Sequence, residues 1–199
     1  MNDSAAQIVL ASASPRRAEL LAQLKIRFKR VIPAVDESAR PGENVVELVR
    51  RLAMVKAWAG SEMAGDALPV LAADTLVAVD GITLGKPADR DDALDMLALL
   101  SGRAHEVLTA VAVVVDGSIQ TEVSRTTVVF RKISVAESLR YWDAGEPRDK
   151  AGAYGIQGIG SVFVERIEGS YSGVVGLPLL ETERLLAAAG VDCWRHRLP

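Results

Sequence analysis

Two neighbouring arginines occur where a helix is expected to begin. In the segment SASPRR, Ser14 suits the N-cap of a helix and Pro15 suits its first turn. Arg16 and Arg17 then lie in that first turn, where the helix dipole is positive and cations are disfavoured. A sequence that needed only a stable helix would place acids there. We therefore interpret this segment, with Ser12, as a phosphate site that also uses free backbone N–H groups, against the alternative of a solvated surface pair.

An acidic residue interrupts an otherwise apolar run. Asp74 lies in the middle of residues 70–79, which predict a buried strand. An unpaired buried carboxylate costs several kcal/mol, so Asp74 must be paired with a cation, bound to a metal or held with a raised pKa. Each of these makes it a candidate general base or magnesium ligand. The competing interpretation is an acid at a strand end that caps a neighbouring loop.

Two lysines and a pair of acids extend the charged set. Lys56 lies on the apolar stripe of an expected helix, so it either reaches the surface along its alkyl stem or projects into a cleft. Lys86 follows an expected hairpin and precedes a proline. Asp36 and Glu37 lie in a loop, where solvated acids are the default interpretation. With the arginines and Asp74, these residues suit a triphosphate and a divalent cation.

Alternating strands and helices must position these residues. Apolar runs predict strands at 8–11, 70–79, 82–84, 107–115 and about 121–130. Capping residues and apolar stripes predict helices at 16–24, from 44, at 89–101, at 134–145 and at about 179–189. Eight of the 16 glycines fall between Gly145 and Gly176, which predicts loops and short strands there. The interleaving favours an α/β fold with helices packed on a mixed sheet rather than a purely parallel one.

Length and composition predict one globular domain over residues 1–199. The chain holds 49% apolar and 25% charged residues, an ordinary globular balance. A domain of this length buries enough surface to fold without disulfides. Its 23 basic and 26 acidic residues leave a net charge of −3 with no block of like charge. Because proteins that bind nucleic acid usually carry a basic face, we expect no nucleic-acid partner.

The few histidines and the single cysteine narrow the chemistry further. His105, His196 and Cys193 are the only residues of these types, which argues against a histidine-rich metal site and an internal disulfide. Acid–base work is therefore left to carboxylates. The N-terminus lacks the basic segment of a signal peptide, and no apolar run reaches the ~20 residues that span a bilayer. We expect a soluble cytoplasmic protein with no membrane association.

The chain lacks the common nucleotide-binding motifs. No GxxxxGK[ST] segment is present, and GIQGIG at 155–160 has the wrong spacing and context for a dinucleotide fingerprint. Several other segments, in order along the chain, resemble the Maf family of nucleotide pyrophosphatases. They are SASPRR with ELL at 19–21, ADT at 73–75, GKP at 85–87, GEPRDKAG at 145–152, AYGIQG at 153–158 and VGLPL at 175–179. The resemblance covers about residues 8–185 without a large insertion.

This resemblance implies an elongated, twisted mixed sheet with flanking helices, in two lobes around a deep cleft, like the fold of inosine triphosphate pyrophosphatases. It also implies hydrolysis of nucleoside triphosphates to the monophosphate and pyrophosphate with a divalent cation, Mg²⁺ or Mn²⁺. The family's catalytic aspartate falls on Asp74. The family's phosphate and metal contacts fall on Ser12, Arg17, Glu37, Lys56 and Lys86. Glu37 and Asp74 would hold the metal.

Three further positions separate the substrate classes of the family. They fall on Arg16, Thr75 and Gln157, and this sequence carries the set that resembles the class accepting dTTP and UTP. These side chains would hydrogen-bond the pyrimidine edge, so that a wrong base leaves polar groups unpaired. The class that prefers 7-methyl-GTP carries a different residue at each position. The implied roles are nucleotide-pool sanitation and cell-division arrest.

Two alternatives stay open at this point. Maf proteins were first associated with inhibition of septum formation, so the cleft could sense a nucleotide instead of hydrolysing it. A sensor needs the cationic residues but not a costly buried Asp74. A pyrophosphatase with another base preference, such as 7-methyl-GTP or modified pyrimidine nucleotides, is the second alternative. A nucleoside triphosphate is the expected partner in each case, and a homodimer is the expected assembly because two-fold dimers are the commonest oligomers.

Overall fold

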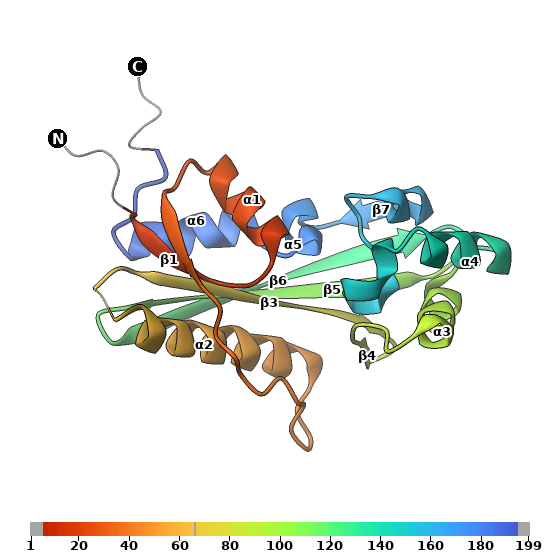
Figure 1. Cartoon of the computed structure of the whole chain (residues 1–199), viewed down its shortest axis with the longest axis horizontal. Coiled ribbons are helices and arrows are strands. Elements are labelled where there is room, and N and C mark those ends of the chain that lie inside the picture. Colours follow the sequence, from red (N-terminus) through yellow and green to blue (C-terminus); the bar gives the residue numbers. More distant parts are fainter. Residues whose placement is uncertain (1–5, 66, 195–199) are drawn as a thin grey trace.

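A mixed β-sheet extends along the long axis of the protein (Figure 1). This computed structural model describes residues 6–65 and 67–194. Within them the sheet has seven strands in the order β2-β1-β3-β5-β6-β7, with β4 paired to β3. The strands are β1 (Ile8–Ala11), β2 (Phe28–Val31), β3 (Val70–Val79), β4 (Ile82–Leu84), β5 (Ala104–Val115), β6 (Ser118–Phe130) and β7 (Val164–Glu168). Strand β1 is parallel to β2 and β3 and the other pairs are antiparallel, so the expected mixed sheet is confirmed.

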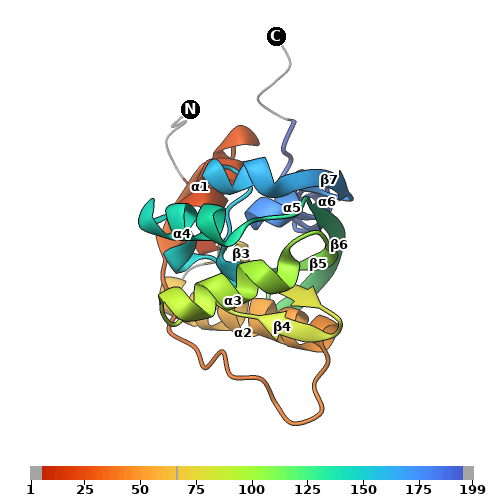
Figure 2. The ribbon, with the colours of Figure 1, turned by 90° about the vertical axis from the view of Figure 1, so that its right-hand side faces the viewer.

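Helices cover both faces of this sheet. They are α1 (Pro15–Gln23), α2 (Val45–Ala64), α3 (Arg90–Leu100), α4 (Val135–Asp143), α5 (Tyr171–Val175) and α6 (Leu179–Ala188). Helix α2 lies on one face, while α1, α5 and α6 lie on the other (Figure 1, Figure 2). In the part of the chain that the structure describes, no helix has the length and apolar character needed to cross a membrane.

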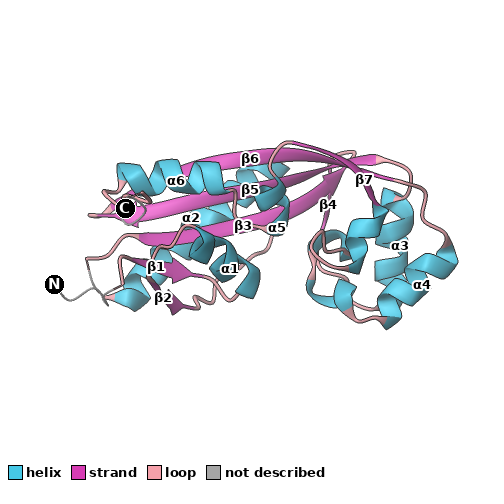
Figure 3. Cartoon of the chain, turned by 90° about the horizontal axis from the view of Figure 1, so that it is seen from above, coloured by secondary structure: helices cyan, strands magenta, loops and turns pink. Residues whose placement is uncertain are grey.

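Long strands connect two lobes, which Figure 3 shows side by side. Strands β3, β5 and β6 extend from one lobe to the other. The large lobe contains β1, β2, α1, α2, α5 and α6. The small lobe contains β4, α3, α4 and the 3₁₀ turns η1 (Glu146–Asp149), η2 (Ala151–Ala153) and η3 (Ile159–Phe163). The expected two-lobed α/β architecture is therefore confirmed.

Local capping residues start the helices where the sequence predicts. The Asn44 side chain accepts from the backbone N–H groups of Val46 and Glu47. The Glu47 carboxylate in turn accepts from the backbone N–H of Asn44, which completes a capping box at the start of α2. Ser134 and Glu137 form the same arrangement at the start of α4. These reciprocal bonds satisfy backbone N–H groups that have no partner inside the helix.

Alternation along β3 decides which face each side chain meets. Val70 and Ala72 pack in the cluster that contains residues of α2, whereas Leu71 and Ala73 pack in the cluster on the opposite face. On the edge away from β5, β3 pairs with β1 at residues 70–71 and with β4 at residues 77–79. The intervening edge, residues 72–76, faces neither strand in this register. Asp74 lies at the centre of that edge segment.

Three expectations about the elements were incomplete or wrong. The strand β2 was not predicted, because Lys29 and Arg30 break its apolar pattern, as is common on an edge strand. Strands β5 and β6 each begin three residues before the predicted start. The glycine-rich stretch holds strand β7 as expected, but it also holds three 3₁₀ turns and the short helix α5 instead of loops and strands alone. In α5, the Ser170 side chain caps the backbone N–H of Gly173.

Candidate active site

A cleft of about 550 Å³ lies between the two lobes. This volume is within the usual range for small-molecule sites. All ten residues that sequence reasoning assigned to a site line it: Ser12, Ser14, Arg16, Arg17, Glu37, Lys56, Asp74, Thr75, Lys86 and Gln157. They come from six separate parts of the chain, and the open edge of β3 brings them to one place.

The loop between β1 and α1 is organised by hydrogen bonds of its two serines. The Ser14 hydroxyl accepts from the backbone N–H of Arg17 at 3.4 Å, which is the predicted N-cap. The Ser12 hydroxyl accepts from the backbone N–H of Ser14 at 3.1 Å. On the outer side, the Arg30 guanidinium donates to the carbonyls of Ser12 and Ala13 at 3.1 and 2.9 Å. Two carbonyls of this loop are therefore occupied by the Arg30 guanidinium where the chain enters α1.

The Arg17 side chain is held from three directions. Its Nε donates to the carbonyl of Gly176 at 2.8 Å, and its two terminal nitrogens donate to the hydroxyls of Ser12 and Thr75 at 3.4 and 3.3 Å. Burial lowers the pKa of the guanidinium and Asp74 opposes that shift. Arginine remains charged in proteins, so Arg17 presents a fixed positive charge to the cleft. This arrangement suits a phosphate group.

Thr75 belongs to the same hydrogen-bond network. Its hydroxyl lies 3.0 Å from the hydroxyl of Thr109, which donates to the carbonyl of Gly173 at 2.7 Å. Because the single hydroxyl hydrogen of Thr109 goes to that carbonyl, Thr75 donates to Thr109 and accepts from Arg17. The structure thus places Thr75 beside the partly buried Arg17, on the opposite face of β3 from Asp74.

Lys56, Asp74 and Glu37 form the second charged group of the cleft. The Lys56 ammonium lies 2.6 Å from a carboxylate oxygen of Asp74 and 2.8 Å from one of Glu37. Asp74 shares the face of β3 that packs against α2, which is why it meets a lysine from that helix. The Asp74 side chain is buried and that of Lys56 is 13% exposed, whereas Glu37 is 60% exposed. Asp74 is therefore paired with a cation within a strand and does not cap a loop.

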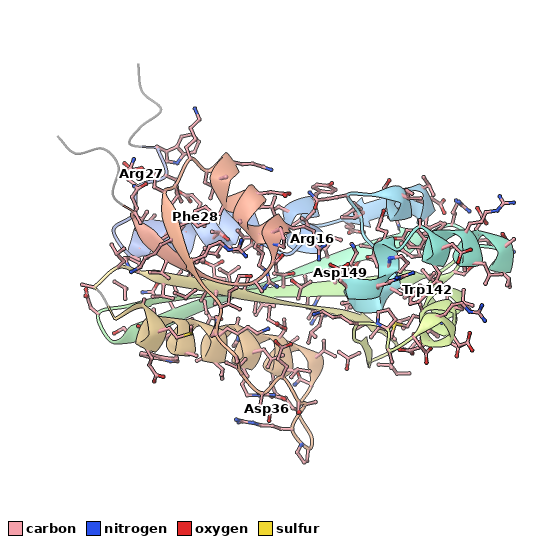
Figure 4. The ribbon with its side chains drawn as sticks, viewed as in Figure 1. Arg16, Arg27, Phe28, Asp36, Trp142 and Asp149 are labelled. Carbon is pink, nitrogen blue, oxygen red and sulfur yellow. The ribbon has the colours of Figure 1, made fainter. Side chains whose placement is uncertain are left out.

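Burial is the main influence on Asp74. It raises the pKa of this carboxyl above the ordinary value, and Glu37 adds to the rise, while Lys56 and Arg17 oppose it. A carboxylate with a raised pKa is a stronger base than a solvated one. The neighbouring acid Asp36 behaves differently, because its carboxylate accepts from the Ser38 backbone at 2.9 Å and closes a turn in the exposed loop (Figure 4). Of the Asp36-Glu37 pair, only Glu37 lines the cleft.

The acids of the cleft suit a cation that arrives with a phosphate ligand. In the two described ranges, no group of three or more His, Cys, Asp and Glu residues is placed to hold a metal. The cleft instead offers the carboxylates of Asp74 and Glu37, gathered around one lysine. Mg²⁺ usually takes one or two protein carboxylates and completes its shell with water and substrate phosphates. The donor set fits that mode of binding.

The small lobe forms the other wall of the cleft. Lys86 follows β4, and a backbone bond of 3.0 Å from Gly152 to the Gly85 carbonyl joins this turn to η2. Gln157 is exposed on the loop between η2 and η3. Across the mouth, Arg16 of α1 lies 3.4 Å from Asp149 of η1, and the two side chains face each other in Figure 4.

Several cleft residues were not assigned a role from the sequence. Asp149, Lys150 and Tyr154 line the cleft, and Glu146 lies behind the loop that carries Gln157. The run GEPRDKAG contains three of these four residues, so the segment was marked by the family resemblance without any role for its side chains. These residues contact side chains and backbone of other turns, and the spacing of residues along the chain does not predict such contacts.

The fold and the site define a two-lobed α/β protein whose cleft holds a buried carboxylate paired with a lysine, together with an arginine fixed by three hydrogen bonds. The chain belongs to the Maf family, because the family model described as Maf-like protein matches residues 7–189. The resemblance inferred from the sequence is therefore confirmed.

Relatives named dTTP/UTP pyrophosphatase match nearly the whole chain. That of Saccharophagus degradans is 47% identical over 99% of this chain and 95% of its own length. Those of Hahella chejuensis and Bordetella parapertussis are 51% and 55% identical, over 97% and 93% of both chains. Among solved structures, a nucleoside-triphosphatase, dITP/XTP pyrophosphatase, from Mycobacterium abscessus matches with a TM-score of 0.47 and 21% identity, over 92% of this chain and 97% of that one.

Proposed function

We propose that this protein is a nucleoside triphosphate pyrophosphatase that hydrolyses dTTP and UTP to the monophosphate and pyrophosphate. Full-length relatives with about half of their residues identical carry that activity in their names. The observation that carries the proposal is the buried Asp74, paired with Lys56 at 2.6 Å and under the electrostatic influence of Arg17, in a cleft of nucleotide size. A cleft that only bound a nucleotide would need the cations but not this costly carboxylate.

Asp74 acts as the general base. Its carboxylate accepts a proton from the water whose oxygen attacks the α-phosphorus, as the bond from that phosphorus to the bridging oxygen breaks and pyrophosphate leaves. The raised pKa strengthens the base, and Lys56 opposes the rise by favouring the ionised carboxylate. Lys56 also orients the carboxylate through the 2.6 Å bond.

The cations of the cleft stabilise negative charge on the phosphates. Arg17 is fixed by three hydrogen bonds, so it loses little freedom when the triphosphate binds. Further positive charge comes from Lys56 and Lys86. Further hydrogen-bond donors come from the N-terminus of α1 and from the hydroxyls of Ser12 and Ser14. Such groups accelerate the reaction most where the charge grows in the transition state.

A divalent cation, Mg²⁺ or Mn²⁺, belongs to the proposal. Glu37 and Asp74 would hold it together with the substrate phosphates. When bound, the cation supplies Lewis-acid neutralisation of phosphate charge. Lys56 forms ion pairs with both acids and so offsets the repulsion between their charges.

Selection of the base falls to the small-lobe wall and the mouth of the cleft. The Gln157 amide offers both a donor and an acceptor, which suits the edge that thymine and uracil share. Arg16 reaches the same mouth, where it is paired with Asp149. The Thr75 hydroxyl bonds Arg17 and Thr109, so its contact with the base stays a prediction. A base with a different edge would leave the Gln157 amide unpaired, which lowers kcat/KM.

The deciding experiment measures pyrophosphate release from a panel of triphosphates, including 7-methyl-GTP, with Mg²⁺. The wild type is compared with Asp74→Asn, which keeps the shape of the side chain but removes the base. Turnover of dTTP and UTP that disappears in the variant is the expected result. Full turnover by Asp74→Asn would contradict the role of Asp74, and nucleotide binding without any pyrophosphate release would favour the sensing function.

The proposal includes a homodimer of single-domain chains in the cytoplasm. Two-fold dimers are the commonest assembly of soluble proteins, and all described elements belong to one sheet and its flanking helices. Light scattering on the purified protein gives the mass of the assembly. Fractionation of cells that express the tagged chain tests its location.

A further inference from the structure

The loop that carries Gln157 is held by side chains with no role in the proposed chemistry. The loop contains three glycines, each of which lies against a side chain from η1 or α4: Gly155, Gly158 and Gly160. A methyl group at Gly158 would overlap the carboxylate of Glu146, and one at Gly160 would lie 2.5 Å from the hydroxyl of Tyr141. The glycines are therefore required for close contact with these two side chains.

Glu146 makes three hydrogen bonds around this loop. One of its carboxylate oxygens accepts from the Tyr141 hydroxyl at 2.7 Å and from the backbone N–H of Gly160 at 3.1 Å. The other accepts from the backbone N–H of Ile159 at 2.8 Å. Burial works against ionisation, but these three donors lower the pKa of Glu146 overall. The carboxylate is therefore an acceptor only, matched to three donors.

Tyr141 holds the opposite end of the same loop. Its hydroxyl donates to Glu146 and accepts from the backbone N–H of Gly155 at 3.0 Å. Burial and the bond to Glu146 raise the pKa of the Tyr141 hydroxyl, so it remains a donor at neutral pH. The segment from Gly155 to Gly160 is thus tied at both ends to one tyrosine–glutamate pair, with Gln157 between the two ties.

We propose that Glu146, with Tyr141, is a positioning residue that sets base selectivity by holding Gln157 toward the cleft. This inference rests on the proposed function, since it assumes that Gln157 contacts the base. Neither side chain needs to contact the substrate. Their effect reaches the base through the backbone of one short loop, whereas the residues proposed to bind the phosphates (Ser12, Arg17, Lys56 and Lys86) lie outside that loop.

The substitution Glu146→Gln separates this role from a general loss of structure. Glutamine keeps the shape but presents one oxygen and one NH₂ group. Whichever way the amide is oriented, the NH₂ group faces at least one of the N–H donors of Ile159 and Gly160. A matched control is Glu137→Gln in the same lobe, which removes a capping carboxylate of α4 that also pairs with Arg131.

The experiment measures kcat and KM for dTTP and for ribose 5-triphosphate, which lacks a base. In Glu146→Gln, we expect kcat/KM for dTTP to fall about tenfold, mostly through KM, because the desolvated donors of the loop lose their acceptor. The value for ribose 5-triphosphate stays within about twofold of the wild type. Glu137→Gln lowers the melting temperature but leaves the ratio of the two substrates unchanged. An equal fall for both substrates in Glu146→Gln would overturn the inference.

Hydrogen exchange supplies a readout that does not need turnover. Amides of residues 155–160 should exchange faster in Glu146→Gln than in the wild type or Glu137→Gln. Tyr141→Phe keeps the carboxylate and should show the same changes more weakly, which covers the case in which Glu146→Gln does not fold. If the wild type releases no pyrophosphate, the proposed function fails and the role in base selectivity fails with it. The exchange rates then decide the positioning role alone: unchanged rates in both variants overturn it, and faster rates support it.

Discussion

The two walls of the cleft are built in different ways. On the large-lobe wall, three charged side chains project from helices α1 and α2 and from strand β3: Arg17, Lys56 and Asp74. Asp74 is buried, the two cations are partly buried, and each of the three is held by hydrogen bonds or an ion pair. On the small-lobe wall, Gln157 is exposed on a loop whose backbone donates two hydrogen bonds to the Glu146 carboxylate. Buried charges need partners at fixed distances, which regular elements provide. A loop is sufficient for a neutral amide that reads a base edge.

This contrast divides the expected effects of mutation. Changes to Arg17, Lys56 or Asp74 on the large-lobe wall should act on kcat and its pH dependence, because these residues supply the base and two of the cations. Changes to Gln157 or its loop on the small-lobe wall should act on the choice of nucleotide and on local stability, because this loop is neutral and is proposed to contact the base.

The largest effect is expected for Lys56→Met. The variant removes the cation that Asp74 and Glu37 share, so the pKa of Asp74, already raised by burial, rises further. Because the base must be ionised, the acid limb of the pH–rate profile moves to higher pH, and kcat at neutral pH falls about a hundredfold or more. Measurement of kcat between about pH 5 and 9, with Lys132→Met as control, tests this. An acid limb at the wild-type pH would argue against the role of Lys56.

The next effect concerns the stability of the small lobe in acid. His105 lies in its core, 2.9 Å from the Tyr154 hydroxyl, and burial lowers the pKa of His105 from 6.5 to about 4. Between these values the unfolded chain binds a proton that the folded one does not, so stability falls as the pH drops from about 6.5 to 4. The full loss is about 3 kcal/mol.

Urea unfolding at several pH values, with wild type and His105→Phe, measures that loss. Phenylalanine does not titrate and retains ring packing against Phe130 and Tyr154. The pH dependence of the unfolding free energy should therefore be weaker in the variant. Parallel curves for the two proteins would show that His105 is not the source, and exchange rates by segment would show whether the small lobe opens first.

A smaller effect is expected for Gln157→Glu. A carboxylate only accepts hydrogen bonds, so it faces the carbonyl oxygens of thymine and uracil without a donor. The value of kcat/KM for dTTP should fall about tenfold to a hundredfold, while that for ribose 5-triphosphate changes little. Gln120→Glu, an exposed position on β6 that does not line the cleft, carries the same charge change as a control. A fall that is equal for both substrates would mean that Gln157 does not read the base.

The smallest effect is expected for Asp149→Asn. The pair with Arg16 crosses the mouth of the cleft, but Asp149 is 66% exposed and the distance is 3.4 Å. Exposed ion pairs contribute about 0.5 kcal/mol, and salt screens them. The variant should therefore change KM by about twofold at low salt and not at all at high salt. A large change that persists at high salt would show that Asp149 itself contacts the nucleotide.

Local signals in the sequence predicted much of the molecule. Ser14, Asn44 and Ser134 cap the helices that they predict, because a cap depends only on residues up to three positions away. The apolar run at 70–79 predicted β3 with its bounds. The charged edge strand β2 and the short helix α5 escaped prediction, since neighbouring elements and not their own residue patterns stabilise them.

The sequence by itself determined that Asp74 needs a partner and that Arg17 lies in an unfavourable position for a simple helix. The tertiary structure decided which groups pair with Asp74 and Arg17. Lys56 reaches Asp74 because α2 packs on one face of β3, and Arg17 meets the Gly176 carbonyl, 159 residues away, on the other face. Caps and apolar runs depend on near neighbours, whereas these contacts depend on how distant elements pack along the open edge of one strand.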